Sequence, residues 1–267
     1  MNRFRLSSGD EIPAVGLGTW QLEGEKCRRV VKQAIKIGYR HIDTAEIYGN
    51  QRFIGQAIKG VREEIFITSK VWFENLHYDD VLSACENSLK ELKTDYIDLY
   101  LIHWPNRSVD IKETMSAMKK LLDDGLIRNI GVSNFTINHL KDALKTGVRI
   151  VANQVEFHPY LYQKELLDFC RKNDILVIAY SPLGRGHVLK DEKIIEIARK
   201  HNKTPAQVCL RWLYEKGIAS IPKASSVKRL KENIDIFDFS LGKDAEKIDA
   251  LNRNFRFVNP SFSDFDY

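Results

Sequence analysis

Short β-like runs alternate along this chain with longer segments of helical period, so that one strand–helix unit recurs about every 30 residues. We expect strands at 15–19, 41–45, 65–71, 96–103, 129–133, 152–157, 176–180 and 219–221. Helices are expected between them at 25–37, 51–59, 79–92, 112–124, 138–144, 163–172, 192–200 and 205–215. This alternation predicts an α/β fold, the (β/α)8 TIM barrel with parallel strands inside and helices outside. A doubly wound open sheet is the alternative.

Further elements flank the predicted barrel. Residues 4–6 and 11–13 surround Gly9 and predict an N-terminal β-hairpin. Two extra helices are expected after the last strand, at 228–236 and 244–252. Thr204, Pro205 and Gln207 predict a capping box with proline at the first helical position. Because no linker-like stretch divides the chain, residues 1–267 are expected to form a single barrel domain.

The composition narrows the class of protein. With 43% hydrophobic and 29% charged residues, the chain is neither disordered nor fibrous, and its four cysteines have irregular gaps typical of reduced thiols in a cytoplasmic protein. The N-terminus has no signal-peptide pattern, and no apolar run reaches the ~18 residues that span a bilayer, so no membrane partner is expected. The net charge of +5 is spread out, which argues against nucleic acid as a partner. A closed barrel exposes no sheet edge, so a monomer is expected.

Polar side chains follow several predicted strands, at the end of a barrel where active sites lie. Asp43, Lys70 and His103 stand at three of these strand ends, and Tyr48 lies in the loop after Asp43. An ammonium near a tyrosine lowers the pKa of the phenol, and a carboxylate keeps a buried ammonium charged. With His103 to orient a carbonyl oxygen, the four groups suit proton transfer to that oxygen while hydride reaches its carbon. Singly, each also fits a structural role: an ion pair, a packed tyrosine or a buried histidine.

Phosphate and metal motifs are incomplete in this sequence. The segment from Gly16 to Gln21 begins like a dinucleotide fingerprint but lacks the third glycine, so a Rossmann site is not expected. A barrel binds phosphate instead with the loops after its seventh and eighth strands, here 181–186 and 223–229. The alternative for the basic residues of the second loop is a solvated helix face. No residues have metal-ligand spacing, so no metal site is expected.

Seven segments of the chain, in order, resemble the aldo-keto reductase family. They are GYRHIDTAEIYGN (38–50), ITSKVW (67–72), YIDLYLIHWP (96–105), GVSNF (131–135), NQVEFHPY (153–160), AYSPLGRG (179–186) and IPKASS with the following Arg229, Glu232 and Asn233. Among members of the family, the chain is most similar to the short bacterial type, the methylglyoxal and 2,5-diketo-D-gluconate reductases.

This resemblance implies a barrel that uses NADPH to reduce small aldehydes and ketones. It implies a catalytic tetrad of Asp43, Tyr48, Lys70 and His103, with Tyr48 as proton donor. The family's cofactor contacts fall on Ser133, Asn134, Gln154, Tyr180, Ser181, Leu183, Lys223, Arg229, Glu232 and Asn233. Where the family usually has serine after the lysine, this chain has Ala224, and Ser225 or Ser226 can take its place. A smaller preference for NADPH over NADH is therefore expected.

The substrate side of the site is expected to be aromatic and open. Trp20, Trp72 and Trp104 follow predicted strands and, with His103, suit small or flat carbonyl substrates. The loop after His103 and the C-terminal segment are short, so steroid-like ligands are expected to bind poorly. The alternatives are a non-catalytic NADPH-binding relative with a regulatory or structural role, which the intact tetrad opposes, and a sugar-phosphate isomerase or hydrolase.

Overall fold

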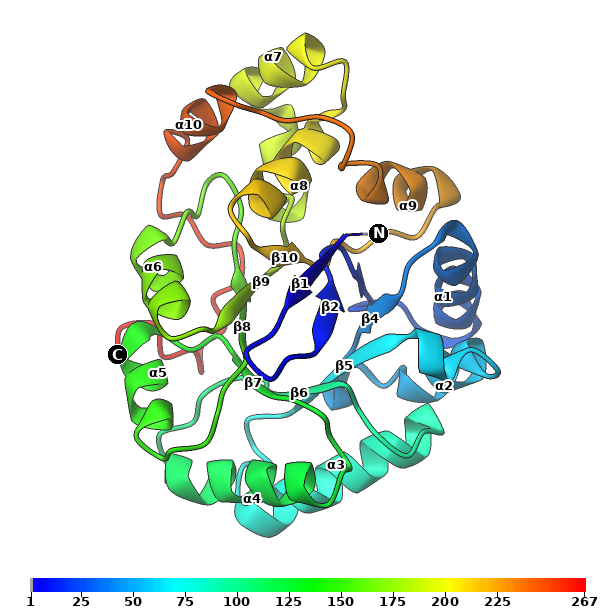
Figure 1. Cartoon of the computed structure of the whole chain (residues 1–267), viewed down its shortest axis with the longest axis vertical. Coiled ribbons are helices and arrows are strands. Elements are labelled where there is room, and N and C mark those ends of the chain that lie inside the picture. Colours follow the sequence, from blue (N-terminus) through cyan, green and yellow to red (C-terminus); the bar gives the residue numbers. More distant parts are fainter. Residues whose placement is uncertain (1) are drawn as a thin grey trace.

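The computed structural model describes residues 2–267, and its centre is a ring of parallel strands (Figure 1). In order around the ring they are β3 (Leu17–Gly18), β4 (His41–Asp43), β5 (Phe66–Val71), β6 (Leu99–Ile102), β7 (Ile130–Ser133), β8 (Ala152–Glu156), β9 (Leu176–Tyr180) and β10 (Ala219–Ser220). A parallel bridge between Val15 and Ser220 joins the two edges of this sheet and closes the ring. The predicted barrel is confirmed.

Helices surround this ring, as the alternation predicts (Figure 1). They are α1 (Gly24–Ile37), α2 (Gln51–Ile58), α3 (Tyr78–Leu92), α4 (Ile111–Asp123), α5 (Ile137–Leu144), α6 (Lys164–Lys172), α7 (Glu192–Lys200), α8 (Pro205–Glu215), α9 (Val227–Ile234) and α10 (Asp244–Asp249). The capping box at the start of α8 is confirmed, because the Thr204 side chain accepts from the Gln207 backbone and the Gln207 side chain accepts from the Thr204 backbone.

Several predicted elements end sooner in the structure. The strand expected at 96–103 is reduced to β6, because Asp98 turns its carboxylate to the Ile67 backbone amide and the Arg62 guanidinium. The last two helices stop at Ile234 and Asp249 rather than at 236 and 252. Four single-turn 3-10 helices were not predicted, since one turn carries no periodic signal: η1 (Glu46–Tyr48), η2 (Arg62–Glu64), η3 (Gly184–Gly186) and η4 (Val188–Lys190).

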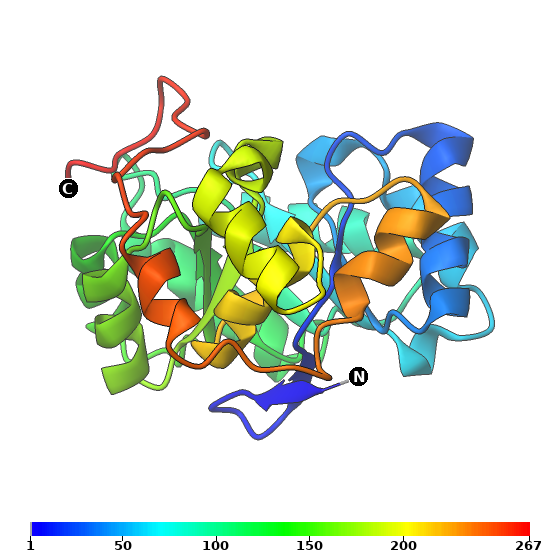
Figure 2. The ribbon, with the colours of Figure 1, turned by 90° about the horizontal axis from the view of Figure 1, so that it is seen from above.

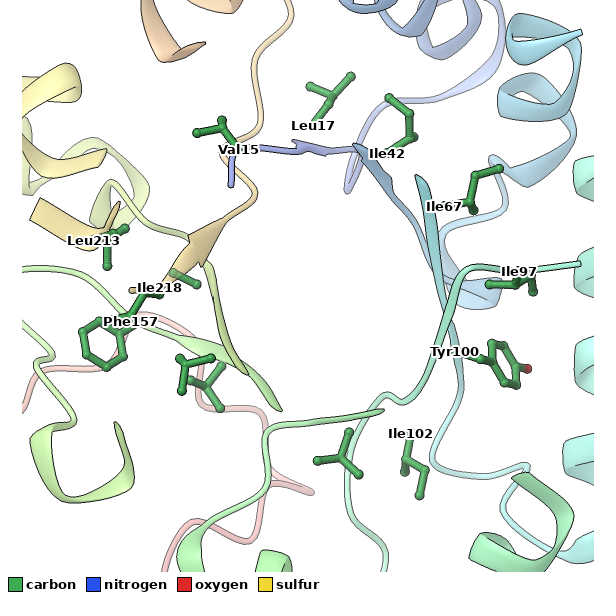
Figure 3. Packing of buried hydrophobic residues seen from close by; sticks show 14 of the residues in the cluster. Val15, Leu17, Ile42, Ile67, Ile97, Tyr100, Ile102, Phe157, Leu213 and Ile218 are labelled. Atoms are coloured by element: carbon green, nitrogen blue, oxygen red, sulfur yellow. The ribbon is translucent and has the colours of Figure 1, made fainter. Parts of the chain in front are cut away.

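Two hydrophobic layers hold the barrel together. Side chains such as Val15, Ile42 and Ile67 point outward from the ring toward the helices (Figure 3). The alternate residues, among them Leu101 and Ile178, fill the interior as a separate cluster. Each such side chain is buried, and burial of one contributes about 1.5–3 kcal/mol. The strands therefore have apolar residues on both faces, which explains their continuous hydrophobic runs.

One end of the barrel is plugged and the other carries the polar side chains. The hairpin of β1 (Arg3–Arg5) and β2 (Glu11–Pro13) brings Leu6 and Ile12 into the interior cluster. In side view, this hairpin and the C-terminal segment lie at opposite ends of the molecule (Figure 2). The strands run toward the end where the C-terminal segment lies, so their polar carboxyl ends are collected there.

Candidate active site

A cavity of about 1000 Å³ opens at the carboxyl ends of the strands. Its wall contains most of the residues that the sequence analysis singled out. They are Trp20, Asp43, Tyr48, Trp72, His103, Trp104, Ser133, Asn134, Gln154, Tyr180, Ser181, Leu183, Lys223, Arg229, Glu232 and Asn233. Two predicted residues are not part of this wall: Lys70, which is buried beneath it, and Ser225, which is exposed to solvent.

Asp43 and Lys70 form a buried ion pair at the floor of the cavity. The Lys70 Nζ donates to Asp43 Oδ1 at 2.6 Å and to the Thr44 carbonyl at 2.7 Å. The second carboxylate oxygen of Asp43 accepts from Gln154 Nε2 at 2.6 Å. Lys70 is fully buried and Asp43 is 2% exposed. Burial lowers the pKa of Lys70 and raises that of Asp43, and the attraction between the two charges opposes both shifts.

Tyr48 and His103 lie together above this pair. Their rings meet edge to face with centroids 5.7 Å apart, and the Lys70 Nζ lies 5.2 Å from the centre of the Tyr48 ring. Trp72 packs edge-on against the other side of His103, at 5.2 Å. Desolvation and the charge of Lys70 lower the pKa of His103 well below its usual value, so the imidazole is neutral at pH 7.

The acidity of Tyr48 differs from the expectation. Lys70 was expected to lower the pKa of this phenol, but burial raises that pKa well above its usual value, with smaller contributions from Asp43 and Tyr180. The phenol therefore keeps its proton at neutral pH. A protonated phenol is the form that can donate a proton, which is the role expected of Tyr48.

Ser133, Asn134 and Tyr180 form a polar wall beside His103. Asn134 Nδ2 donates to the His103 carbonyl at 3.0 Å, and the Tyr180 hydroxyl donates to Asn134 Oδ1 at 2.7 Å. The Ser133 hydroxyl donates to the Gln154 carbonyl at 2.8 Å. Asn134 has a positive φ of 63°, which asparagine tolerates better than most residues. The ends of β7, β8 and β9 are thus tied to the backbone of His103.

The opposite end of the cavity is cationic. Lys223 follows β10, and Arg229 lies in the first turn of α9, where the helix also exposes unpaired backbone amides. Ala224 is buried, and the Ser226 hydroxyl caps α9 by accepting from the Arg229 amide at 3.4 Å. Neither Ser225 nor Ser226 therefore lines the cavity, whereas Lys223 and Arg229 do, as does Arg185 of η3.

Residues 14–253 match the model of the aldo/keto reductase family. The chain belongs to the aldo-keto reductase family. It is 51% identical to the glyoxal reductase of Bacillus subtilis (strain 168) over 96% of this chain and 95% of that protein. Enzymes of this family carry out NAD(P)H-dependent carbonyl reduction and typically use NADPH.

Solved structures of aldo-keto reductases superpose closely on the chain. An aldo/keto reductase from Brucella melitensis is 45% identical, with a TM-score of 0.90 over 94% of this chain and 99% of that one. An aldo-keto reductase from a Medee basin deep-sea metagenome library is 40% identical, with a TM-score of 0.93 over 99% of this chain and all of that one.

The aromatic wall of this aldo-keto reductase is supported by a residue that sequence analysis missed. Phe262, from the C-terminal segment, packs edge-on against Trp72 and Trp104 at 5.5 Å and stacks on Phe73 at 4.4 Å. The C-terminal segment is held in place by the buried Glu156, whose carboxylate accepts from the backbone amides of residues 257 and 258 at 2.8 and 3.0 Å. No pattern in the sequence links this segment to strands almost 200 residues earlier.

Two findings concern other kinds of site. Among residues 2–267, no group of three or more His, Cys, Asp or Glu side chains is arranged to hold a metal ion. Over the same residues, no helix is both long enough and apolar enough to cross a membrane.

Proposed function

We propose that this aldo-keto reductase uses NADPH to reduce small aldehydes and ketones to alcohols, with Tyr48 as the proton donor. The observation that carries the proposal is the packing of Tyr48 against His103, directly above the buried Asp43–Lys70 pair. Burial raises the pKa of Tyr48 and lowers that of His103, which favours a protonated phenol and a neutral imidazole. A proton donor, a neutral hydrogen-bond donor and a fixed positive charge then meet at one point of the cavity wall. These are the groups that a carbonyl oxygen needs as it gains negative charge.

The cavity also fits a dinucleotide such as NADPH. Ser133, Asn134 and Gln154 lie beside the tetrad on the cavity wall, where an amide-bearing ring would find hydrogen-bonding partners. Its other end has Lys223 and Arg229 at the start of α9, a combination that suits a phosphate dianion. These two cations support a preference for NADPH over NADH. The preference is expected to be reduced, because neither Ser225 nor Ser226 joins them on the wall.

The tetrad residues have distinct roles in the proposed reaction. Bound NADPH supplies the hydride. His103, being neutral, donates a hydrogen bond that orients the carbonyl oxygen, and Tyr48 transfers its phenolic proton to that oxygen. Lys70, fixed by Asp43 and the Thr44 carbonyl, stabilises the phenolate that Tyr48 becomes.

We propose small dicarbonyls such as methylglyoxal, and keto-sugar acids, as substrates. The name of the Bacillus subtilis relative, glyoxal reductase, supports the first class. Trp20, Trp72 and Trp104 give the substrate end flat apolar walls, and Phe262 packs against Trp72 and Trp104. Such a space suits short carbonyls better than steroid-sized molecules.

The test follows NADPH oxidation by its absorbance, with methylglyoxal and a panel of other carbonyls, for the wild type and Tyr48→Phe. We expect the wild type to oxidise NADPH with methylglyoxal. We expect Tyr48→Phe to lose this activity but still to bind NADPH. If the wild type binds NADPH but reduces none of the carbonyls, the protein is a non-catalytic NADPH-binding protein and not a reductase. Failure to bind NADPH would refute the assignment of the cationic end.

We further propose that the enzyme is a cytoplasmic monomer. The barrel closes on itself and offers no sheet edge to a partner. Its four cysteines are free and buried, as suits a reducing compartment. Light scattering on the purified protein tests the monomer, and a mass of two or more chains would contradict it.

A further inference from the structure

The loop that carries Tyr48 is closed at its base by a side-chain hydrogen bond. Thr44 directly follows β4 at one end of this loop, and Asn50 is the N-cap residue of α2 at the other end. The Thr44 hydroxyl donates to Asn50 Oδ1 at 2.7 Å, and both side chains are fully buried. Between them, Tyr48 lies in a single 3-10 turn that ends at Gly49 in a left-handed conformation. Such a turn has little stability of its own, so its geometry depends on how its ends are fixed.

The amide of Asn50 also holds the loop that carries Trp20. Asn50 Nδ2 donates to the carbonyls of Thr19 and Leu22, each at 3.0 Å. The Asn50 side chain thus uses both of its amide hydrogens on one loop and its oxygen on the other. The loops after β3 and β4, which carry the substrate wall and the proton donor, share this one buried group.

These contacts form a closed circuit with the catalytic pair. Lys70 Nζ donates to the Thr44 carbonyl at 2.7 Å and to Asp43 at 2.6 Å. Thr19 donates to the Asp43 carbonyl through its amide at 3.1 Å and through its hydroxyl at 2.8 Å. Every polar side chain of the circuit is buried, so water cannot replace a lost bond without opening the structure.

We propose that Thr44 and Asn50 are positioning residues for Tyr48, and that Asn50 couples the placement of Tyr48 to that of the Trp20 loop. The inference rests on the proposed function, in which Tyr48 is the proton donor. Neither residue touches the reacting atoms. Thr44 fixes the width of the seven-residue loop between β4 and α2, and Asn50 fixes the separation between this loop and the one carrying Trp20. A displacement of about 1 Å at a catalytic group costs up to ~100-fold in rate, so loss of the closing bond should be visible in the chemical step.

The test compares Thr44→Val with Thr44→Ser and with Thr114→Val. Valine keeps the shape of threonine but removes the hydroxyl, whereas serine keeps the hydroxyl. Thr114 is the matched control, because it is a buried threonine of α4 whose hydroxyl donates to the Leu76 carbonyl at 2.7 Å, away from the tetrad. Single-turnover NADPH oxidation measures the chemical step, and fluorescence titration measures NADPH affinity.

Thr44→Val should slow the single-turnover rate by about tenfold, with NADPH affinity within about twofold of wild type. Thr44→Ser should retain most of the wild-type single-turnover rate. Thr114→Val should have the wild-type rate, although it loses about as much thermal stability as Thr44→Val. Asn50→Asp removes the two amide hydrogens that Asn50 donates to the loop carrying Trp20. This variant should in addition raise the KM for the carbonyl substrate. A wild-type rate in Thr44→Val would overturn the inference, as would an equal slowing in Thr114→Val.

A second readout keeps the two proposals separate. In protein labelled with fluorotyrosine, the fluorine signal of Tyr48 is identified by its loss in Tyr48→Phe. It should be single in the wild type and Thr44→Ser, and broadened or split in Thr44→Val. A single unshifted signal in all three proteins would refute the positioning role even if no substrate were turned over. Failure of the wild type to reduce any carbonyl would refute the proposed function while leaving this measurement valid.

Discussion

Removing one member of the buried Asp43–Lys70 pair should destabilise the protein strongly. In Lys70→Met the Asp43 carboxylate, 2% exposed, loses a partner at 2.6 Å and keeps only the Gln154 amide. Breaking such a pair costs about 3–5 kcal/mol, a large share of the ~5–15 kcal/mol that stabilises a typical domain. For a chain of this size, the melting temperature should fall by about 6–20 °C.

The pH dependence of this loss has a defined sign. Without Lys70, the folded-state pKa of Asp43 rises further above the unfolded value of about 3.9. A carboxyl whose pKa is raised by folding destabilises the fold where it is ionised. The deficit of Lys70→Met is therefore greatest at neutral pH. It decreases once the pH falls below the raised pKa and vanishes below the unfolded value of about 3.9.

Urea unfolding of the two single variants and the double variant at neutral pH tests this reasoning. Asp43→Asn and Lys70→Met should each be destabilised, and the double variant should be more stable than the sum of the two losses predicts, by about 2–3 kcal/mol. Additive losses, or a single loss below about 1 kcal/mol, would mean that the pair is not coupled as its geometry indicates. A deficit in Lys70→Met that grows toward acid pH would refute the sign.

Three further outcomes are expected. Because burial raises the pKa of Tyr48 and lowers that of His103, the single-turnover reduction rate should be constant from about pH 6 to pH 9, and a midpoint near pH 7 in that profile would contradict the assigned protonation states. In fluorescence titrations, Arg229→Ala should weaken NADPH binding by about 10–100-fold and leave NADH binding nearly unchanged. If the binding of both cofactors is weakened equally, Arg229 contacts a part of the cofactor that NADPH and NADH share. Phe262→Ala should raise kcat/KM for bulky aromatic aldehydes several-fold while changing that for methylglyoxal by less than about twofold, and a uniform change would show that Phe262 does not limit the size of the substrate.

The barrel could be predicted from sequence because its strands are buried on both faces and its helices are not. The predicted strands are too long where a β-like run of residues extends beyond the hydrogen-bonded ladder. Ile97 forms only an isolated parallel bridge with Ile127, because Asp98 beside it bonds the Ile67 amide and the Arg62 guanidinium, and the continuous ladder of β6 begins at Leu99. Such an end is set by a side chain from a neighbouring segment, which local periodicity cannot register.

The positions of the candidate site residues were predictable for a different reason. Asp43 ends β4, His103 directly follows β6 and Gln154 lies in β8, and the parallel topology brings the carboxyl ends of these strands to one side. What the sequence could not supply is the degree of burial, which decides the acidity of Tyr48 and reverses the expected direction of its shift. It also could not place Phe262, because an irregular segment is positioned only by its contacts with Trp72 and Trp104.

The opposite placement of the two chain ends matters for anyone who handles this protein. The N-terminal hairpin closes the far end of the barrel, away from the cavity (Figure 2). Tyr267, in contrast, donates through its hydroxyl to Asp142, and its backbone carbonyl accepts from the Thr136 side chain at 2.7 Å, within the segment that carries Phe262. An affinity tag or fused reporter attached before residue 2 should therefore leave turnover intact. The same tag after Tyr267 would compete with these contacts and alter which substrates enter.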